Sequence, residues 1–325
     1  MKIAHLVSSK IFAGIEQHVY ELACEMNKDT EQIILCNNKI ANDMQNVKTY
    51  SIKMGSRYSP INLIKLFYVL KKNNIDILHC HGAKASLIGC WVKQIFGTKV
   101  VSTIHGHKSK KSSFLMPNAT IGVNKKLAGN VEHGVFIPNW FNPSHAGEPS
   151  TREGLIIAIG RLEKVKGFDL LISSWINIEQ QLEIIGSGPE EQFLRKLITS
   201  LGLDNRISIV TDCNYSSIEE KYKTAKGLIV SSLREGGPRV VLEAINHEVP
   251  VLGTSVGIIP ELISNEFLIE PNNQNALQAM LEEMVPLLPQ INMKGIKSAL
   301  TDEYSIKNAS KKTKDIYLSL ARANL

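Results

Sequence analysis

The stretch GLIVSSLREGGPRVVLEAINHEVPVLG, residues 227–253, contains the clearest signal of the fold. An apolar run (227–230) is followed by a glycine-rich loop, a helical pattern over Val240–Asn246 and a second apolar run over Val249–Gly253. Short apolar runs without polar alternation are typical of parallel strands that are buried on both faces. The stretch therefore predicts a strand–helix–strand unit of a parallel sheet.

The same alternation continues outward from this stretch in both directions. In the second half we expect further strands at Leu155–Gly160, Gln181–Ile185 and Ile207–Val210, and helices at Gly167–Trp175, Glu190–Leu201 and Ser216–Thr224. In the first half we expect strands at Ile3–Ser8, Gln32–Cys36, Ile75–His81, Lys99–Ile104 and Ala119–Val123, and helices at Gly14–Asn27, Pro60–Lys72 and Ala83–Phe96. Such alternation predicts two Rossmann-like α/β domains.

A segment rich in Pro, Asn, Ser and Gly, residues 138–150, separates the two halves and has the composition of a linker. The chain has 325 residues, which suits two hydrophobic cores better than one. We expect domains over residues 1–142 and 143–305 and a last helix over residues 306–325. Ligands of parallel sheets bind at the carboxyl ends of the strands, so the site should lie in a cleft that both domains face.

Composition excludes several classes of protein. No apolar run is long enough to cross a membrane, and the N-terminus predicts a first strand, not a signal peptide. The five cysteines are scattered without the spacing of metal ligands, which indicates reduced thiols in a cytoplasmic protein. The net charge of +6 is modest, and no nucleic-acid-binding motif accompanies it. Basic clusters at residues 71–72, 108–111 and 125–126 favour an anionic lipid or acceptor, or only a solvated surface.

The strongest site signal is the loop and helix start SSLREGGPRVVLEA, residues 231–244. Its glycines permit close approach of a ligand to the backbone, and the helix start offers N–H groups to an anion. Glu235 in the loop and Glu243 inside the helix can both point into one site. The alternative is a tight turn in which Glu235 only complements the helix dipole.

Three further turns follow strands and precede helices. The segment Gly160–Gly167 places Arg161 and Lys166 at a strand end, where they suit a diphosphate. Gly186 and Gly188 flank a serine after the next strand, where a nucleotide could lie. Gly14 stands at the first strand–helix turn, but the three spaced glycines of a dinucleotide fingerprint are absent. Taken alone, each turn also fits an ordinary connection.

Histidines end two strands of the first half. His79, His81, His105 and His107 occupy these positions, and His105 lies where the cleft is expected. Each also fits a purely structural role.

Together these turns resemble the pattern of glycosyltransferase family four, a retaining, nucleotide-sugar-dependent family with the GT-B fold. Residues 231–244 resemble its paired-glutamate motif, residues 249–254 and 257–261 follow as in the family, and residues 160–167 resemble its phosphate-binding segment. The resemblance is strong over residues 154–263 and weaker over the first half. It implies that the last helix crosses back to the first domain.

The resemblance also implies residue roles. Arg161 and Lys166 would neutralise the diphosphate, Glu235 would bind hydroxyls of the donor sugar, and Glu243 would hold the ribose. His105 would contact the donor sugar, Gly14 would approach the phosphate, and Gly186 and Gly188 would lie near the base. The implied catalytic residues are His105, Arg161, Lys166 and Glu235, and the implied donor-binding residues are Gly14, Gly186, Gly188, Gly236, Gly237, Pro238, Arg239, Val240 and Glu243.

Two departures from the family pattern leave the donor open. Ala13-Gly14 replaces the usual pair of glycines, and Arg239 places a large cation beside the expected sugar pocket. Because no Asp-x-Asp segment is present, we expect no metal and no cofactor, with a UDP-sugar, or second a GDP-sugar, as co-substrate. The family implies retention through attack on the face that the nucleotide leaves; the alternative is double displacement with Glu235 as nucleophile.

The expected acceptor is a glycan or lipid-linked molecule of cell-envelope polysaccharide synthesis, such as lipopolysaccharide, O-antigen or capsule. The helix at residues 60–74 combines apolar residues with a basic end, which suits an anionic membrane surface at the inner face of the cell membrane. The alternative is a helix packed on the sheet with a solvated end. Other functions considered are a GT-B epimerase, a nicotinamide oxidoreductase and a catalytically degenerate partner subunit that binds sugar nucleotides.

Overall fold

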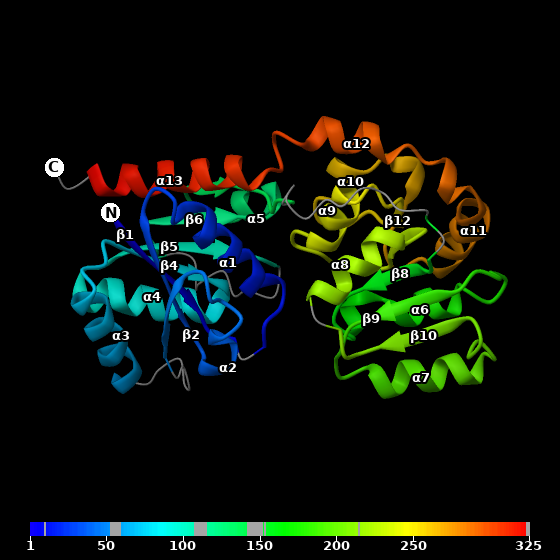
Figure 1. Cartoon of the computed structure of the whole chain (residues 1–325), viewed down its shortest axis with the longest axis horizontal. Coiled ribbons are helices and arrows are strands. Elements are labelled where there is room, and N and C mark those ends of the chain that lie inside the picture. Colours follow the sequence, from blue (N-terminus) through cyan, green and yellow to red (C-terminus); the bar gives the residue numbers. More distant parts are fainter. Residues whose placement is uncertain are drawn as a thin grey trace. The chain divides into compact units, whose positions relative to one another are not determined.

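The computed structural model describes residues 1–9, 11–52, 60–106, 116–141, 152, 154–213 and 215–322. The chain forms two compact units: Met1–Trp140 with Tyr304–Leu325, and Phe141–Glu303. Each unit contains one parallel sheet with helices packed against it (Figure 1). The expected pair of parallel-sheet α/β domains is therefore confirmed. The boundary expected between residues 142 and 143, His107 and the basic cluster at residues 108–111 lie outside the described residues.

The first unit is built on a seven-stranded sheet in the order β3-β2-β1-β4-β5-β6-β7. Its strands are β1 (Lys2–Val7), β2 (Glu31–Cys36), β3 (Lys48–Ser51), β4 (Ile77–His81), β5 (Lys99–Ile104), β6 (Ala119–Gly122) and β7 (Gly134–Phe136). All neighbours are parallel, and β1 pairs with β4 so that His5 lies opposite His79. The strand order reverses between β1 and β4, and parallel sheets bind ligands at the carboxyl side of such a point.

The helices of the first unit are α1 (Gly14–Met26), α2 (Asn38–Ala41), α3 (Pro60–Lys72), α4 (Gly82–Phe96), α5 (Lys125–Gly129) and α13 (Ile306–Arg322). The last helix, α13, packs beside α1 (Figure 1). Its Tyr317 is fully buried in one cluster with Ile3 and Ile77, and Lys99 Nζ donates to the carbonyl of Leu320 at 2.6 Å. The C-terminal helix is thus part of the core of the first unit.

The second unit has a six-stranded parallel sheet in the order β10-β9-β8-β11-β12-β13. Its strands are β8 (Ile156–Ile159), β9 (Leu182–Ile185), β10 (Ile207–Val210), β11 (Gly227–Val230), β12 (Val251–Thr254) and β13 (Leu268–Ile269). Its helices are α6 (Phe168–Ser173), α7 (Glu191–Ser200), α8 (Tyr215–Thr224), α9 (Arg239–Asn246), α10 (Ile259–Leu262), α11 (Gln274–Met284) and α12 (Met293–Leu300), with short 3-10 turns η3 (Lys164–Lys166), η4 (Asn265–Phe267) and η5 (Val285–Gln290).

Strands β3, β7 and β13 were not predicted from the sequence. All three are short. The sequence of β3 is polar. Strand β7 has three residues and β13 has two, and each lies at an edge of its sheet. Strands of this kind bury little apolar surface and so leave no run in the sequence. Among the described helices, none combines the length and the apolar character that crossing a membrane requires.

Candidate functional site

The carboxyl end of the second sheet brings two of the predicted turns together. Lys166 ends η3, just after β8, and Glu235 lies in the loop between β11 and α9. Lys166 Nζ is 2.5 Å from Glu235 Oε1, and Ser232 Oγ donates to the same oxygen at 2.6 Å. The two charged side chains are only 20% and 12% exposed. The site therefore holds a cation and a carboxylate in a largely dry, hydrogen-bonded arrangement.

Backbone contacts fix these two turns against each other. Ser231 Oγ donates to the carbonyl of Lys166 at 2.9 Å, and the N–H of Leu233 donates to the carbonyl of Val165 at 2.8 Å. Gly167 has φ +63°, and a Cβ there would lie 2.2 Å from the carbonyl oxygen of Ser231. A glycine is therefore required at this junction for both conformation and space.

Arg161 lies on the same turn as Lys166 and is far more exposed. Its guanidinium binds both oxygens of Glu163 at 3.0 Å each, and 65% of the side chain is accessible. The Lys166 side chain passes over Gly160, where a Cβ would meet Lys166 Cε at 3.1 Å. An exposed ion pair contributes little to stability, so Arg161 can exchange its carboxylate for an anionic ligand at low cost.

The glycines after β9 are explained by packing within the protein. Gly186 has φ +146°, and a Cβ there would lie 1.9 Å from the carbonyl oxygen of Gly160. A Cβ at Gly188 would lie 2.4 Å from the carbonyl oxygen of Leu162. The turns after β8 and β9 thus pack directly on each other. A role for these glycines beside a nucleotide base stays a prediction.

The α9 helix carries the second glutamate, Glu243, as the spacing predicted. Glu243 Oε2 accepts a hydrogen bond from Tyr222 Oη at 3.2 Å, and its other oxygen lies 3.7 Å from Nε of Arg239. Arg239 opens the helix after Pro238 and is largely buried, and Val240 accepts from Tyr222 through its carbonyl. Arg239 therefore belongs to an i,i+4 ion pair with Glu243 along α9.

In the first unit, Gly14 is the first residue of α1. A buried carboxylate already occupies this helix start: Glu16 accepts from the N–H of Ala13 at 3.0 Å and from Ser9 Oγ at 2.6 Å. The partial positive charge of the helix N-terminus thus has a protein partner. Approach of a phosphate to Gly14 stays a prediction.

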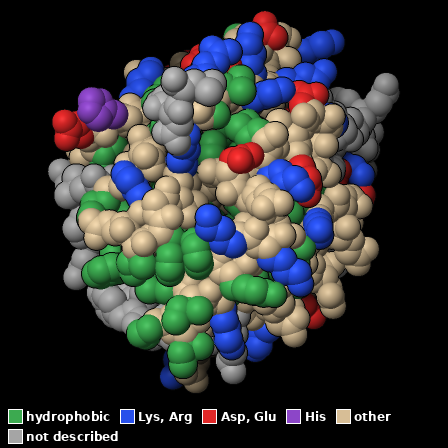
Figure 2. All heavy atoms as spheres, turned by 90° about the vertical axis from the view of Figure 1, so that its left-hand side faces the viewer, with side chains coloured by type: hydrophobic (Ala, Val, Ile, Leu, Met, Phe, Trp, Pro, Cys, Tyr) green, Lys and Arg blue, Asp and Glu red, His purple; other side chains and the backbone are tan. Residues whose placement is uncertain are grey.

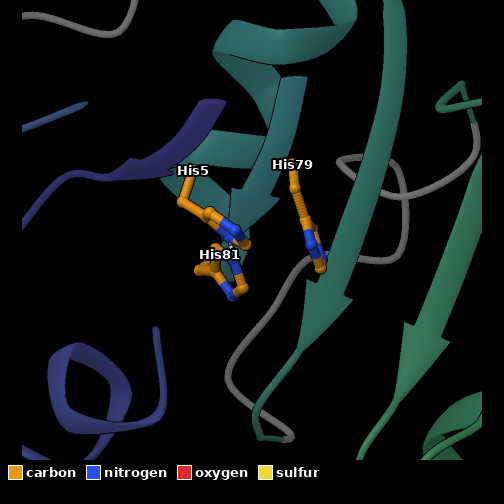
Figure 3. Close-up of side chains that lie close together, drawn as sticks. All are labelled: His5, His79 and His81. Atoms are coloured by element: carbon orange, nitrogen blue, oxygen red, sulfur yellow. Dashed lines mark hydrogen bonds between the residues drawn. The ribbon is translucent and has the colours of Figure 1, made fainter. Parts of the chain in front are cut away.

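His105 directly follows β5 and lies against several other histidines. His81 Nδ1 is 3.4 Å from His105 Nε2, and the rings of His18 and His105 meet edge to face at 4.6 Å between centroids. His5, His79 and His81 lie side by side on the neighbouring strands β1 and β4 (Figure 3). All three are buried.

Burial controls the charge of these three rings. It lowers the pKa of His5 to about 4, against hydrogen bonding to Gln32, which raises it. Burial also holds the pKa values of His79 and His81 well below the usual range, and neighbouring histidines add to the effect. The three imidazoles are therefore neutral at neutral pH.

Among the described residues, only two sets of histidines bring three possible ligand atoms close enough together to hold a metal ion. One set is His5, His79 and His81, and the other is His18, His81 and His105; in each, the candidate ligand atoms lie within 4.8 Å of one another. In the first set, His79 already contacts Tyr317 Oη at 2.5 Å and Thr103 Oγ1 at 2.7 Å. A metal at that set would displace existing hydrogen bonds.

Sequence reasoning missed Ser232, Tyr222, His5, His18 and Gln32 as parts of these sites. Ser232 and Tyr222 hydrogen-bond to the two glutamates, His5 and His18 lie against His81, and Gln32 hydrogen-bonds to His5. His5 lies within the apolar run of a first strand, so a polar side chain inside a buried strand was the available signal.

A cavity of about 810 Å³ also opens in the first unit. It is lined by residues at the starts of β4 and β5, among them Ile77 and Lys99, and by Phe67 and Lys71 of α3. It thus lies at the amino ends of the strands, opposite the edge where parallel sheets bind ligands.

Comparison with known proteins gives a consistent result for both units. A family model described as Glycosyltransferase Family 4 matches residues 12–146, and one described as Glycosyl transferases group 1 matches residues 143–287. A phosphatidylinositol N-acetylglucosaminyltransferase polypeptide of Arabidopsis thaliana is 23% identical over 94% of this chain and 78% of its own length. The N-acetyl-alpha-D-glucosaminyl L-malate synthase of Bacillus anthracis is 24% identical over 67% of each chain.

Solved structures share the fold over nearly the whole chain. The Anabaena protein HepE in complex with UDP-glucose has a TM-score of 0.85 at 16% identity and covers 98% of this chain and 100% of its own. The sucrose-phosphate synthase of Thermosynechococcus elongatus has a TM-score of 0.84 at 17% identity, covering 99% of each chain. With the fold, the two family models and the paired-glutamate segment in agreement, the chain belongs to glycosyltransferase family four and is a GT-B glycosyltransferase.

Proposed function

We propose that the protein transfers a hexose-type sugar from a nucleotide diphosphate sugar to a glycan or lipid-linked acceptor with retention of configuration. The observation that carries this proposal is the contact of Lys166 with Glu235 and Ser232 at the carboxyl ends of β8 and β11. It supplies a cation for a leaving diphosphate and a carboxylate for sugar hydroxyls within one small volume. We place the reaction in cell-envelope polysaccharide synthesis at the inner face of the cell membrane.

In this proposal donor binding exchanges two ion pairs. Lys166 leaves Glu235 and Arg161 leaves Glu163, and both cations turn to the diphosphate. Glu235, with Ser232 still bound to it, then accepts hydrogen bonds from the donor sugar. Because the two cations neutralise the leaving group, no metal ion is required at this site.

The remaining predicted residues complete the donor site in the same proposal. Glu243 binds the ribose from α9, and the loop Gly236–Val240 surrounds the sugar and phosphate. Gly186 and Gly188 lie near the base, Gly14 near the phosphate, and His105 contacts the donor sugar. The two relatives described above are named for N-acetylglucosaminyl groups, and one structural neighbour holds UDP-glucose, which supports a UDP-linked hexose first.

The chemistry we propose is a same-face substitution. The bond between the anomeric carbon and the phosphate oxygen breaks while the acceptor oxygen bonds to the same face of that carbon. The acceptor proton passes to the leaving phosphate oxygen. Glu235 is a poor nucleophile for a double displacement because, in this proposal, Ser232 holds one of its oxygens and hydroxyls of the donor sugar occupy the carboxylate.

The test is a panel of UDP-, GDP-, ADP- and dTDP-sugars, N-acetylated hexoses included, with the purified full chain in the presence of a chelator. Thermal shift reports binding, and slow release of the nucleotide reports turnover. We expect one donor to stabilise the protein, and the effect to be lost in Glu243→Ala and Arg161→Ala. If a nucleotide sugar binds but is never turned over, a degenerate partner subunit replaces the transferase proposal. If no nucleotide sugar binds, the transferase proposal fails.

For the acceptor side we propose that the face of α3 and α4 rests on an anionic membrane surface. Figure 2 shows hydrophobic side chains gathered on this face with Lys and Arg among them. The exposed apolar residues are Ile61, Ile64, Tyr68, Trp91 and Ile95, and the basic residues nearby are Lys65, Lys71 and Lys72. The opposite side of α3 is packed through Leu66 and Leu70, so the apolar stripe faces outward.

Replacing Ile64 and Tyr68 by glutamate should therefore weaken binding to phosphatidylglycerol vesicles by about tenfold or more. The substitutions remove apolar contact and add repulsion from the lipid headgroups. Cosedimentation measures the effect, with Phe193→Glu on α7 of the second unit as a matched exposed control. Equal vesicle binding by the α3 variant and the control would contradict the proposal that this face binds the membrane.

A further inference from the structure

Three imidazoles form a continuous hydrogen-bonded series through the core of the first unit. His5 Nε2 contacts Gln32 Oε1 at 2.9 Å, and His5 Nδ1 contacts His81 Nε2 at 3.1 Å. His81 Nδ1 then contacts His105 Nε2 at 3.4 Å. The series therefore runs from Gln32 on β2 to His105, the histidine that follows β5 (Figure 3 shows His5 and His81).

The buried end of this histidine series sets the direction of the hydrogen bonds along it. The side-chain amide of Gln32 faces two oxygens of Thr30, the carbonyl oxygen at 3.4 Å and the hydroxyl oxygen at 2.6 Å. A carbonyl can only accept, so the Gln32 atom on this side is the donor Nε2. Oε1 of Gln32 consequently faces His5 and accepts.

Each proton position then determines the next. His5 donates from Nε2 to Gln32, so Nδ1 of neutral His5 accepts from His81 Nε2. Nδ1 of neutral His81 accepts in turn from His105 Nε2. In the neutral form of His105, which carries one proton, Nδ1 is then an acceptor.

We propose that Gln32, His5 and His81 are positioning residues that hold His105 in the Nε2–H form, so that His105 Nδ1 accepts a hydrogen bond from a hydroxyl of the donor sugar. The inference rests on the function proposed above. An accepting nitrogen suits a hydroxyl and repels a phosphate oxygen, which also only accepts at neutral pH. His105 is thereby assigned to the sugar and not to the diphosphate.

The chemistry of the buried end supports a binding role over a basic one. A histidine that serves as a general base is commonly backed by a carboxylate, which stabilises the imidazolium that forms. Here the histidine series ends on a neutral amide, so a proton gained at His105 meets no counter-charge within the series. Packing adds to the positioning: His18 lies against the His105 ring, and Trp140 lies 4.2 Å from His18 between ring centroids.

The first experiment is nitrogen NMR of the full chain labelled with 15N-histidine, without ligand. The spectrum distinguishes protonated from unprotonated ring nitrogens, and loss of signals in His105→Asn assigns the residue. We expect a proton on Nε2 of His105 in the wild type and a mixture of both tautomers in Gln32→Met. His133→Asn is the control, since His133 is exposed and its φ of 55° is tolerated by asparagine.

The second experiment compares two amides at position 105 with the donor found in the panel. Asparagine places its amide near the former Nδ1 and glutamine near the former Nε2. We expect His105→Asn to retain about fivefold to tenfold more kcat/KM than His105→Gln, because only the former keeps an acceptor for the hydroxyl. The comparison remains decisive if Gln32→Met does not fold.

Three results would overturn the inference. They are a wild-type His105 protonated on Nδ1, equal activity of the two amide variants, and stoichiometric Zn²⁺ binding that is lost in His81→Ala, since a metal would take the His81 nitrogen that accepts here. The NMR measurement needs no donor. If no donor in the panel binds, the transferase proposal fails, but the NMR measurement still decides the tautomer of His105.

Discussion

Replacing Glu235 by alanine is expected to lower kcat/KM by about 100- to 1,000-fold, the effect typical of losing a charged group that acts in the transition state. Glu235 is only 12% exposed and its Oε1 holds both Lys166 and Ser232. Its loss removes the partner of the donor sugar and leaves the Lys166 ammonium without its carboxylate in a poorly hydrated place. Steady-state kinetics with the donor from the panel measures the effect.

A double substitution distinguishes this role from simple destabilisation. Because Lys166 and Glu235 act as one unit, Lys166→Ala combined with Glu235→Ala should cost much less than the product of the single effects. Glu191→Ala is the matched control, because Glu191 forms an exposed ion pair with Arg195 on α7. Independent single effects, or an equal loss in the control, would contradict the proposed site.

Acidification should unfold the first unit before the second. His5 is neutral in the folded protein with a pKa of about 4, against an ordinary value of 6.5 in the unfolded chain. The folded pKa is the lower one, so this stabilisation is complete above pH 6.5 and is lost as the pH falls toward 4. His5 alone then costs about 3 kcal/mol at pH 4, and His79 and His81 add in the same direction.

Urea unfolding between pH 7 and pH 4 measures this loss. Fluorescence of buried Trp140 reports the first unit, and that of buried Trp175 reports the second, each in a variant in which the other two of the three tryptophans are replaced. A loss of this size is a large part of the stability of a typical domain. An unchanged free energy of unfolding of the first unit at pH 5 would show that the three rings are not buried in neutral form.

The sequence by itself determined the class of fold, and it predicted the site residues of the second unit. Apolar runs bounded by helical patterns are local properties, and a parallel sheet follows from them. The carboxyl ends of parallel strands share one edge, so the residues that follow β8 and β11 were expected at the same edge of the sheet. Lys166 and Glu235 were predicted from this placement and from the resemblance of their motifs before any contact was known.

Only the tertiary structure decided how these residues pair and what surrounds His105. The local sequence does not show that Lys166 pairs with Glu235 while Arg161, on the same turn, pairs with Glu163. The histidine series joins strands that are far apart in sequence, and Tyr317 reaches His79 from a helix 238 residues away. Such contacts depend on strand order and on the side of the sheet that a late helix covers. Hydrophobic periodicity encodes burial, but it does not encode which buried polar groups meet.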